Sequence, residues 1–216
     1  MKVEIWSDVV CPWCYIGKRR FERALAAFDR ADEVEVEWRS FQLNPEQPRG
    51  ARTTHDEYLA SKLRMPIDQV HELNERVVSL ASAEGLAYDF DRYQVINTLD
   101  AHRVAHLGAS LGLGDAVQER FLRGQLCEGE VLDDPDTLAR LGAEVGIPES
   151  DTREVLAGDS FAAEVSADID EARALGINGV PFFVLDRRYG ISGAQSSEVF
   201  LQALEQASRE AARTAS

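Results

Sequence analysis

Residues 2–14 read Lys-Val-Glu-Ile-Trp-Ser-Asp-Val-Val-Cys-Pro-Trp-Cys, and this stretch decides the fold. Its first half alternates, with Val3 and Ile5 on one side, as a half-buried strand does. Apolar residues at helical spacing follow over 21–28, and residues 33–39 alternate again as Glu-Val-Glu-Val-Glu-Trp-Arg. Parallel neighbours need a crossover of about this length, so the first 40 residues predict a β-α-β unit.

The middle of the chain, residues 46–159, has a helical pattern almost throughout. Within it, Asp134-Pro135 is typical of an N-cap followed by proline at the first helical position, and Gly146 is typical of a helix end. No repeat, low-complexity tract or Ser/Gly linker interrupts the pattern. We therefore expect one helical insertion.

Strands return near the carboxyl end. Ser160 can cap a helix that Gly176 ends, and the apolar run at 180–185 opens with a proline and predicts a strand. Residues 189–192 indicate a short partner strand, and 197–211 indicate a last helix.

The layout suggests two units. Residues 1–45 and 160–216 together supply about one domain's worth of chain, and residues 46–159 form a helical insertion domain. The fold class is therefore α/β.

Composition narrows the function. The 216 residues include 23 Lys+Arg against 38 Asp+Glu, and the net charge of −15 disfavours a nucleic-acid partner. No apolar run approaches the roughly 18 residues of a membrane span, so we expect no membrane partner. The start of the chain lacks the pattern of a secretory signal, which favours the cytoplasm. Three cysteines, an odd number, argue against a disulfide framework.

Cys11 and Cys14 lie between the first predicted strand and the start of the first predicted helix. With Cys11 at the N-cap, Pro12 occupies the first helical position, where its missing N–H costs nothing. The amides of Trp13 and Cys14 are then expected to point at the Cys11 sulfur, and the helix dipole to favour its thiolate. Cys14, one turn later, can attack a mixed disulfide and release the substrate.

The two cysteines allow other interpretations. A zinc site could add His102 and His106, but far more residues separate them from the cysteines than the roughly 12–20 of finger-type sites. We therefore expect no metal. A buried structural pair without chemistry is a further alternative. Val180-Pro181 is ambiguous alone, because the proline is either an ordinary trans residue at a strand start or a functional cis one.

Five segments in order carry a family resemblance over nearly the whole chain. They resemble the DsbA family of the thioredoxin superfamily, and more narrowly its FrnE-like cytosolic branch, which is related to 2-hydroxychromene-2-carboxylate isomerases and kappa-class glutathione transferases. The segments are Ser7-Asp8-Val9-Val10 with the Cys-Pro-Trp-Cys motif, Phe41-Gln42-Leu43-Asn44-Pro45, Asn97-Thr98-Leu99-Asp100-Ala101-His102-Arg103, Gly179-Val180-Pro181-Phe182-Phe183 and Ile191-Ser192-Gly193-Ala194-Gln195.

The resemblance implies a thioredoxin-like fold with a large all-helical insertion between the second strand and the later β-β-α unit. It implies dithiol–disulfide exchange with Cys11 as attacking thiol, Cys14 as resolving thiol and a cis Pro181 beside them. The Val180 backbone would hydrogen-bond an extended substrate. Substrates would be disulfide-containing proteins or small thiols, with no cofactor beyond glutathione as an optional co-substrate.

The chain departs from its relatives in two places. The isomerases and transferases carry serine where this chain has Cys11, which disfavours glutathione-dependent isomerisation or transfer on a small aromatic molecule, the first alternative function. Secreted members with Cys-Pro-His-Cys have histidine where this chain has Trp13, so we expect a milder oxidant. A non-catalytic, chaperone-like binding module is the second alternative. In a reducing cytosol, reductase or isomerase work is favoured over net oxidation.

Some expectations concern single residues and assembly. Trp13, with Pro12, is expected to present an apolar platform to substrate. Cys127 is expected to be a structural thiol. His102, Arg103 and His106 either line a groove near the active site or form a hydrogen-bonded helix face. The chain is expected to be a monomer or a homodimer, and the sequence does not choose between them.

Overall fold

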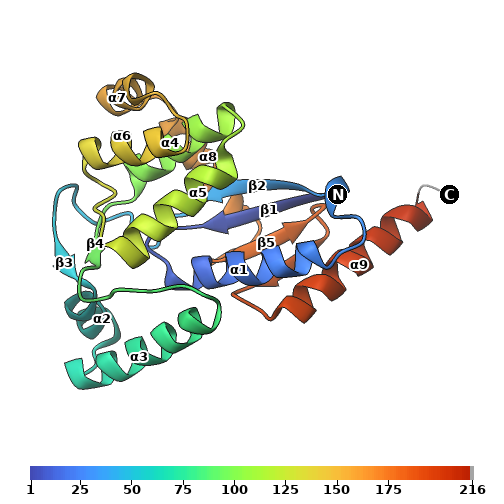
Figure 1. Ribbon diagram of the computed structural model, residues 1–216, viewed down its shortest axis with the longest axis horizontal. Coiled ribbons are helices and arrows are strands. Elements are labelled where there is room, and N and C mark those ends of the chain that lie inside the picture. Colours follow the sequence, from blue (N-terminus) through green and yellow to red (C-terminus); the bar gives the residue numbers. More distant parts are fainter. Residues whose placement is uncertain (215–216) are drawn as a thin grey trace.

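A four-stranded sheet forms the centre of the protein in the computed structural model, which describes residues 1–214 (Figure 1). The two strands at the start of the chain, 35–40 and 2–7, run parallel; 182–185 pairs antiparallel with 2–7, and 189–192 pairs antiparallel with 182–185. Both predicted strand pairs near the two ends of the chain are confirmed. In spatial order the strands are β2 (Glu35–Ser40), β1 (Lys2–Ser7), β5 (Phe182–Leu185) and β6 (Tyr189–Ser192).

Helices cover both faces of this sheet. Along one face lie α1 (Pro12–Ala26) and α9 (Ser197–Thr214), which run side by side in Figure 1. The other face is covered by α8 (Ala162–Ala174). Alternate residues of β1 serve the two faces: Ile5 joins the α1/α9 cluster, and Trp6 packs against α8. This alternation is the one that the sequence predicts for a strand.

The insertion lies between β2 and α8. It forms two groups of helices, with α2 and α3 apart from α4 to α7 (Figure 1). Its short strands β3 and β4 pair antiparallel, a feature that the sequence pattern does not predict, because each spans two residues. After the short 3-10 helix η1 (Ala31–Glu33) and β2, the elements are β3 (Thr53–Thr54), α2 (His55–Leu63), α3 (Ile67–Ala83), β4 (Gln94–Val95), α4 (Leu99–Ser110), α5 (Gly114–Arg123), the π-helical η2 (Gly124–Glu128), α6 (Pro135–Glu144) and α7 (Glu149–Ala157).

Two of the predicted helix boundaries can be compared in detail. Asp134 caps α6 as predicted, because its carboxylate accepts the Thr137 N–H at 2.8 Å. Ser160 does not cap α8. The N-cap is Phe161, whose φ of 63° is left-handed, while the Ser160 carbonyl accepts a hydrogen bond from Arg103.

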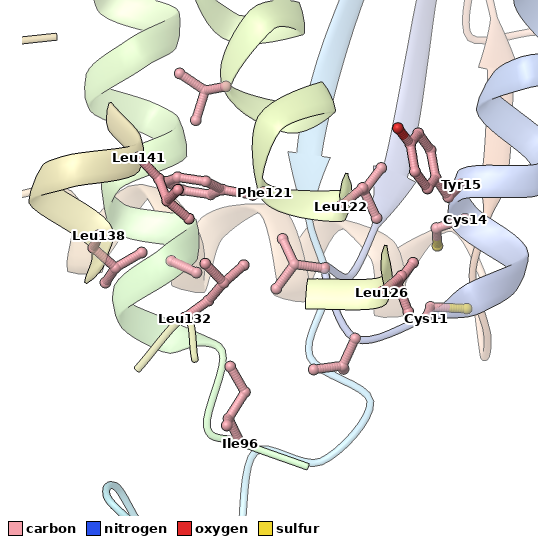
Figure 2. Close-up of a cluster of buried hydrophobic side chains, with 14 of the residues drawn as sticks. Cys11, Cys14, Tyr15, Ile96, Phe121, Leu122, Leu126, Leu132, Leu138 and Leu141 are labelled. Carbon is pink, nitrogen blue, oxygen red and sulfur yellow. The ribbon is translucent and has the colours of Figure 1, made fainter. Parts of the chain in front are cut away.

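The largest buried cluster joins the first helix to the insertion (Figure 2). Cys11, Cys14 and Tyr15 contribute to it from α1 and its start, and Leu122 and Leu126 from the insertion. This core crosses the predicted domain boundaries at residues 45 and 160. The division into two domains stays a prediction. None of the helices described is both long and apolar enough for a membrane crossing.

Candidate active site

The two cysteines occupy the start of α1, as predicted. Cys11 is the N-cap, in extended conformation, and Pro12 is the first helical residue. Both thiols are unbonded and buried, with 4% of Cys11 and 1% of Cys14 exposed. Cys14 lies within hydrogen-bonding reach of Cys11, so the two sulfurs are placed for reversible bridging.

The hydrogen bonds around Cys11 correct one expectation. The Cys14 N–H donates to the Cys11 carbonyl oxygen at 3.0 Å, closing the first turn, and no helix amide bonds to the Cys11 sulfur. Instead, the Cys11 thiol donates to the Val180 carbonyl at 3.4 Å. The predicted amide contacts to the Cys11 sulfur are therefore wrong, because the first turn of α1 directs its hydrogen bond to the Cys11 carbonyl instead.

The Val180–Pro181 peptide bond is cis, which resolves the choice that the sequence left open. The Pro181 carbonyl accepts the Gly193 N–H at 2.8 Å. On the opposite side, a Cβ on Gly17 would come within 2.9 Å of the proline ring, so α1 approaches this loop closely because Gly17 has no side chain. The structure thus brings Cys11, Val180 and Pro181 together from chain segments about 170 residues apart.

Burial raises the pKa of the Cys14 thiol well above its ordinary value, and the neighbouring Cys11 raises it further through a hydrogen bond and its charge. A hydrogen bond with Ser7 acts in the opposite direction. The Gln118 amide donates to the Ser7 hydroxyl oxygen at 2.9 Å, and both residues are buried. Gln118 belongs to the insertion, and nothing in its local sequence indicates this role, because the contact spans 111 positions.

A buried carboxylate lies just before the motif. Asp8 accepts the Leu43 N–H at 2.8 Å through Oδ2, while Oδ1 lies 3.4 Å from His102 Nε2 without a hydrogen bond. His106 instead contacts Ser40 and Asp168, at 3.1 and 3.0 Å. His106 is therefore held by Ser40 and Asp168, whereas His102 faces the Asp8 carboxylate. Residues 1–214 contain no group of three or more His, Cys, Asp or Glu placed to hold a metal ion.

A cavity of about 600 Å³ opens beside Cys11. Pro12, Trp13 and Val180 line it next to Cys11, and α2 and α3 supply the opposite wall. Trp13 is 39% exposed, so it presents apolar surface as predicted. The Tyr88 and Tyr93 hydroxyls donate hydrogen bonds to the Pro12 and Val10 carbonyls at 2.6 and 2.7 Å and so fix the backbone of the motif. The sequence does not predict these contacts, because both tyrosines are distant from the motif along the chain.

Residues 2–205 match the DSBA-like thioredoxin domain family, nearly the whole chain. The chain belongs to this family. A crystal structure of a probable DsbA oxidoreductase from Streptomyces coelicolor is 45% identical, covers 97% of this chain and 91% of its own, and superposes with a TM-score of 0.94. These findings confirm the predicted thioredoxin-like fold and the thiol–disulfide oxidoreductase class.

More distant structures share the fold of this DSBA-like chain. The cytosolic disulfide reductase DsbM of Pseudomonas aeruginosa, solved with GSH, is 20% identical, with a TM-score of 0.68 over 97% of this chain and all of that one. A 2-hydroxychromene-2-carboxylate isomerase is 16% identical, with a TM-score of 0.71 over both whole chains. The uncharacterized protein YwbO of Bacillus subtilis is 44% identical over 43 residues, so the match spans only 20% of that relative's length and 20% of this chain.

The remaining candidates in this DSBA-like domain have structural partners. Arg103 is buried and donates to the Ser160 carbonyl at 2.9 Å and to Asp100 at 2.8 Å, which ties α4 to the start of α8. Cys127 is partly buried, and this burial raises the pKa of its thiol to about 11. A thiol with so high a pKa is a poor nucleophile at neutral pH.

Proposed function

We propose that this protein reduces or isomerises disulfides in the cytoplasm, with Cys11 as the attacking thiol and Cys14 as the resolving thiol. One observation carries the proposal: a buried dithiol at the N-terminus of α1 faces the Val180 carbonyl and Pro181 at the mouth of a cavity. Cys11 is only 4% exposed, but it lines the cavity, so a substrate in the cavity can reach its sulfur and contact the wall beside it.

The first step joins substrate to enzyme. The Cys11 thiolate attacks one sulfur of a substrate disulfide, the S–S bond breaks, and the other sulfur leaves as a thiolate that takes a proton from water. An extended substrate would donate a backbone N–H to the Val180 carbonyl, the group that the Cys11 thiol contacts at 3.4 Å. Pro12 and Trp13 would contact the substrate side chains beside the disulfide.

The second step releases the substrate. Cys14 loses its proton and attacks Cys11, which forms the Cys11–Cys14 disulfide and expels the second substrate sulfur. Burial raises the pKa of Cys14, so this step needs help to ionise the thiol. Ser7 offers such help, because a hydrogen bond to the thiolate stabilises the charged form and Gln118 holds the Ser7 oxygen at 2.9 Å.

Glutathione as reductant and the FrnE-like branch complete the proposal. Support comes from the Cys-Pro-Trp-Cys motif, which keeps cysteine where the isomerases are expected to have serine, and from the likeness in fold to a disulfide reductase described as cytosolic and solved with GSH. In a cytosol poised near or below about −220 mV, a dithiol of moderate potential works as reductant or isomerase.

The test combines turnover with the reduction potential. The purified protein is assayed for insulin reduction and equilibrated in a glutathione buffer series. We expect a potential near the cytosolic poise, and a value near about −120 mV, as in the oxidant DsbA, would contradict reductase work.

Two variants separate the alternatives. Cys11→Ser is expected to abolish insulin reduction, whereas a chaperone-like binding module would keep all its activity. Cys14→Ser is expected to trap the Cys11 mixed disulfide after one turnover. A glutathione-dependent isomerase or transferase would instead continue to turn over without Cys14. Cys127→Ser, which removes the third thiol, is the matched control and should retain activity.

A further inference from the structure

The cavity beside Cys11 is lined mainly by apolar side chains. The polar or charged lining residues are Asp8, Asn44, His55, Lys62, Asn74, Arg76 and Thr98. The apolar lining from α2 and α3 consists of Leu59, Leu63, Leu73, Val77 and Leu80. At about 600 Å³ the space suits one small molecule or the arm of one, since ligand pockets commonly measure about 300–1,000 Å³.

Two cations line the same cavity without an acidic partner. Lys62 donates to the Tyr58 hydroxyl at 2.9 Å, and Arg76 is exposed. Among the ion pairs of residues 1–214, none includes either side chain, although the chain carries 38 acidic residues and most of its arginines are paired. Asp8 lines the same cavity, and Arg76 also borders a neighbouring hollow with two glutamates of α3, so the surroundings are mixed in charge. Because neither Lys62 nor Arg76 is engaged in an ion pair, these two side chains can bind an anionic group of a ligand.

A buried polar atom in the wall also lacks a partner. His55, at the first turn of α2, is 7% exposed, and its Nδ1 makes no hydrogen bond. Burial lowers the pKa of His55, so its ring is neutral at pH 7 and stacks on Phe90 with centroids 4.6 Å apart. An unpaired buried nitrogen is costly unless a ligand or water satisfies it, which points to a polar atom of a bound molecule.

We propose that this cavity binds a small disulfide whose apolar carbon arm ends in a carboxylate, with the sulfur at Cys11 and the carboxylate at Lys62 and Arg76. This inference rests on the proposed function and names its substrate class. A wholly polar thiol compound would leave the leucine-lined wall in contact with water or polar groups, and a neutral apolar one would leave the two cations unused.

The reaction is a two-electron reduction. The Cys11 thiolate opens the substrate S–S bond and forms a mixed disulfide, and the freed sulfur is protonated by water. Cys14 then displaces the second sulfur, which is also protonated. The substrate disulfide becomes two thiol groups, carried on one molecule when the disulfide is cyclic, while Cys11 and Cys14 become a disulfide. A low-molecular-weight thiol added in excess restores the enzyme dithiol and is itself oxidised to its disulfide.

The probes are lipoate, a cyclic disulfide on a carbon arm ending in a carboxylate, and lipoamide, its neutral amide. Polar 2-hydroxyethyl disulfide serves as the reference substrate. We expect kcat/KM for lipoate to exceed that for lipoamide by about tenfold, as one well-placed charge interaction of about 1.4 kcal/mol requires. In the double variant Lys62→Gln with Arg76→Gln the preference should vanish while the reference substrate is unaffected. Arg64→Gln, an exposed arginine of the same hairpin outside the cavity lining, is the matched control.

Filling the cavity provides an independent arm. Leu80→Trp, at a position 39% exposed that lines the cavity, should lower kcat/KM for lipoate and lipoamide alike and spare 2-hydroxyethyl disulfide. The inference would be overturned if the protein used lipoate and lipoamide equally well. It would also be overturned if the protein preferred insulin to both of them and neither the double variant nor Leu80→Trp altered that preference. Both results would leave the proposed function intact. Loss of turnover on every disulfide in the unaltered protein would overturn both.

Discussion

Burial and a few polar neighbours set the pKa of the Cys14 thiol. Because burial raises the pKa of Cys14, the thiolate fraction at neutral pH is small and grows about tenfold for each unit of pH below that pKa. We predict that release of a Cys11 mixed disulfide accelerates in this way from pH 6 to at least pH 9. Rapid-mixing kinetics with a preformed mixed disulfide measures this rate, and a plateau near neutral pH would contradict the prediction.

Ser7 provides a sharper residue-scale test. Removing its hydroxyl in Ser7→Ala takes away a hydrogen bond to a charged sulfur, worth about 1.5 kcal/mol, so release should slow about tenfold at pH 7. Ser40 is its register partner on β2, is equally buried and contacts His106 instead of a cysteine. Ser40→Ala should therefore keep the normal rate. Equal slowing in both variants would indicate a general packing defect.

The sequence predicts the thiol chemistry and the helix starts, but it does not predict which distant residues contact them. Cys11-Pro12 marks a helix start by local rules, and so does the Asp134 cap. The Ser7–Gln118 pair and the cavity wall depend on how the insertion folds back on α1, and no local pattern encodes that placement. Similarly, the choice between trans and cis at Pro181 required the surrounding contacts, because both forms fit the same sequence.

At the scale of elements, the close approach of α1 to the Pro181 loop is testable. In Gly17→Ala the new methyl would lie 2.9 Å from the proline ring, so the loop must shift. We predict that the unfolding free energy falls by about 1–2 kcal/mol. The rate of insulin reduction should fall by a larger fraction of its value than the unfolding free energy does. Gly114→Ala on α5, where the nearest atoms stand at 3.5 Å, is the control. If both variants retain activity, the loop position is unimportant.

Contacts between α1 and α5 predict a pH-dependent stability. Burial alone would raise the pKa of Glu119, but hydrogen bonds from Arg19 and Tyr15 and the charge of Lys18 lower it to about 2. Since the unfolded value is about 4.3, the unfolded chain binds more protons between these pH values, and the stabilisation is present above pH 4.3 and lost toward pH 2.

Glu119→Gln should therefore destabilise the protein at pH 7 and less so as the pH falls. With the side chain 29% exposed, solvent screening reduces the expected cost to about 1–2 kcal/mol. Urea denaturation at pH 7, 4 and 3 measures the difference from the unaltered protein. A difference that stays constant over this range would assign the effect to packing instead of charge.

At the scale of the whole molecule, the shared core decides how the protein unfolds. Phe121, Leu122 and Leu126 of the insertion are fully buried in the cluster that holds Cys11 and Cys14 (Figure 2). Neither unit keeps this cluster covered without the other. A second core lies between the sheet and the helices α1 and α9. Its residues all come from before residue 45 or after residue 160, and it shares α1 with the first core. The helix that begins at the two cysteines thus belongs to both cores.

We therefore predict one cooperative unfolding transition, although chains of this size often unfold in steps. The three tryptophans, at positions 6, 13 and 38, report on the first unit by fluorescence, whereas far-UV circular dichroism is dominated by helices, many of them in the insertion. The two signals should follow one denaturation curve. Phe121→Ala, which removes a fully buried ring at a cost of about 3–5 kcal/mol, should shift both curves together. A variant that shifts only the dichroism curve would mean that residues 46–159 unfold independently, and would give the predicted domain boundary a thermodynamic basis.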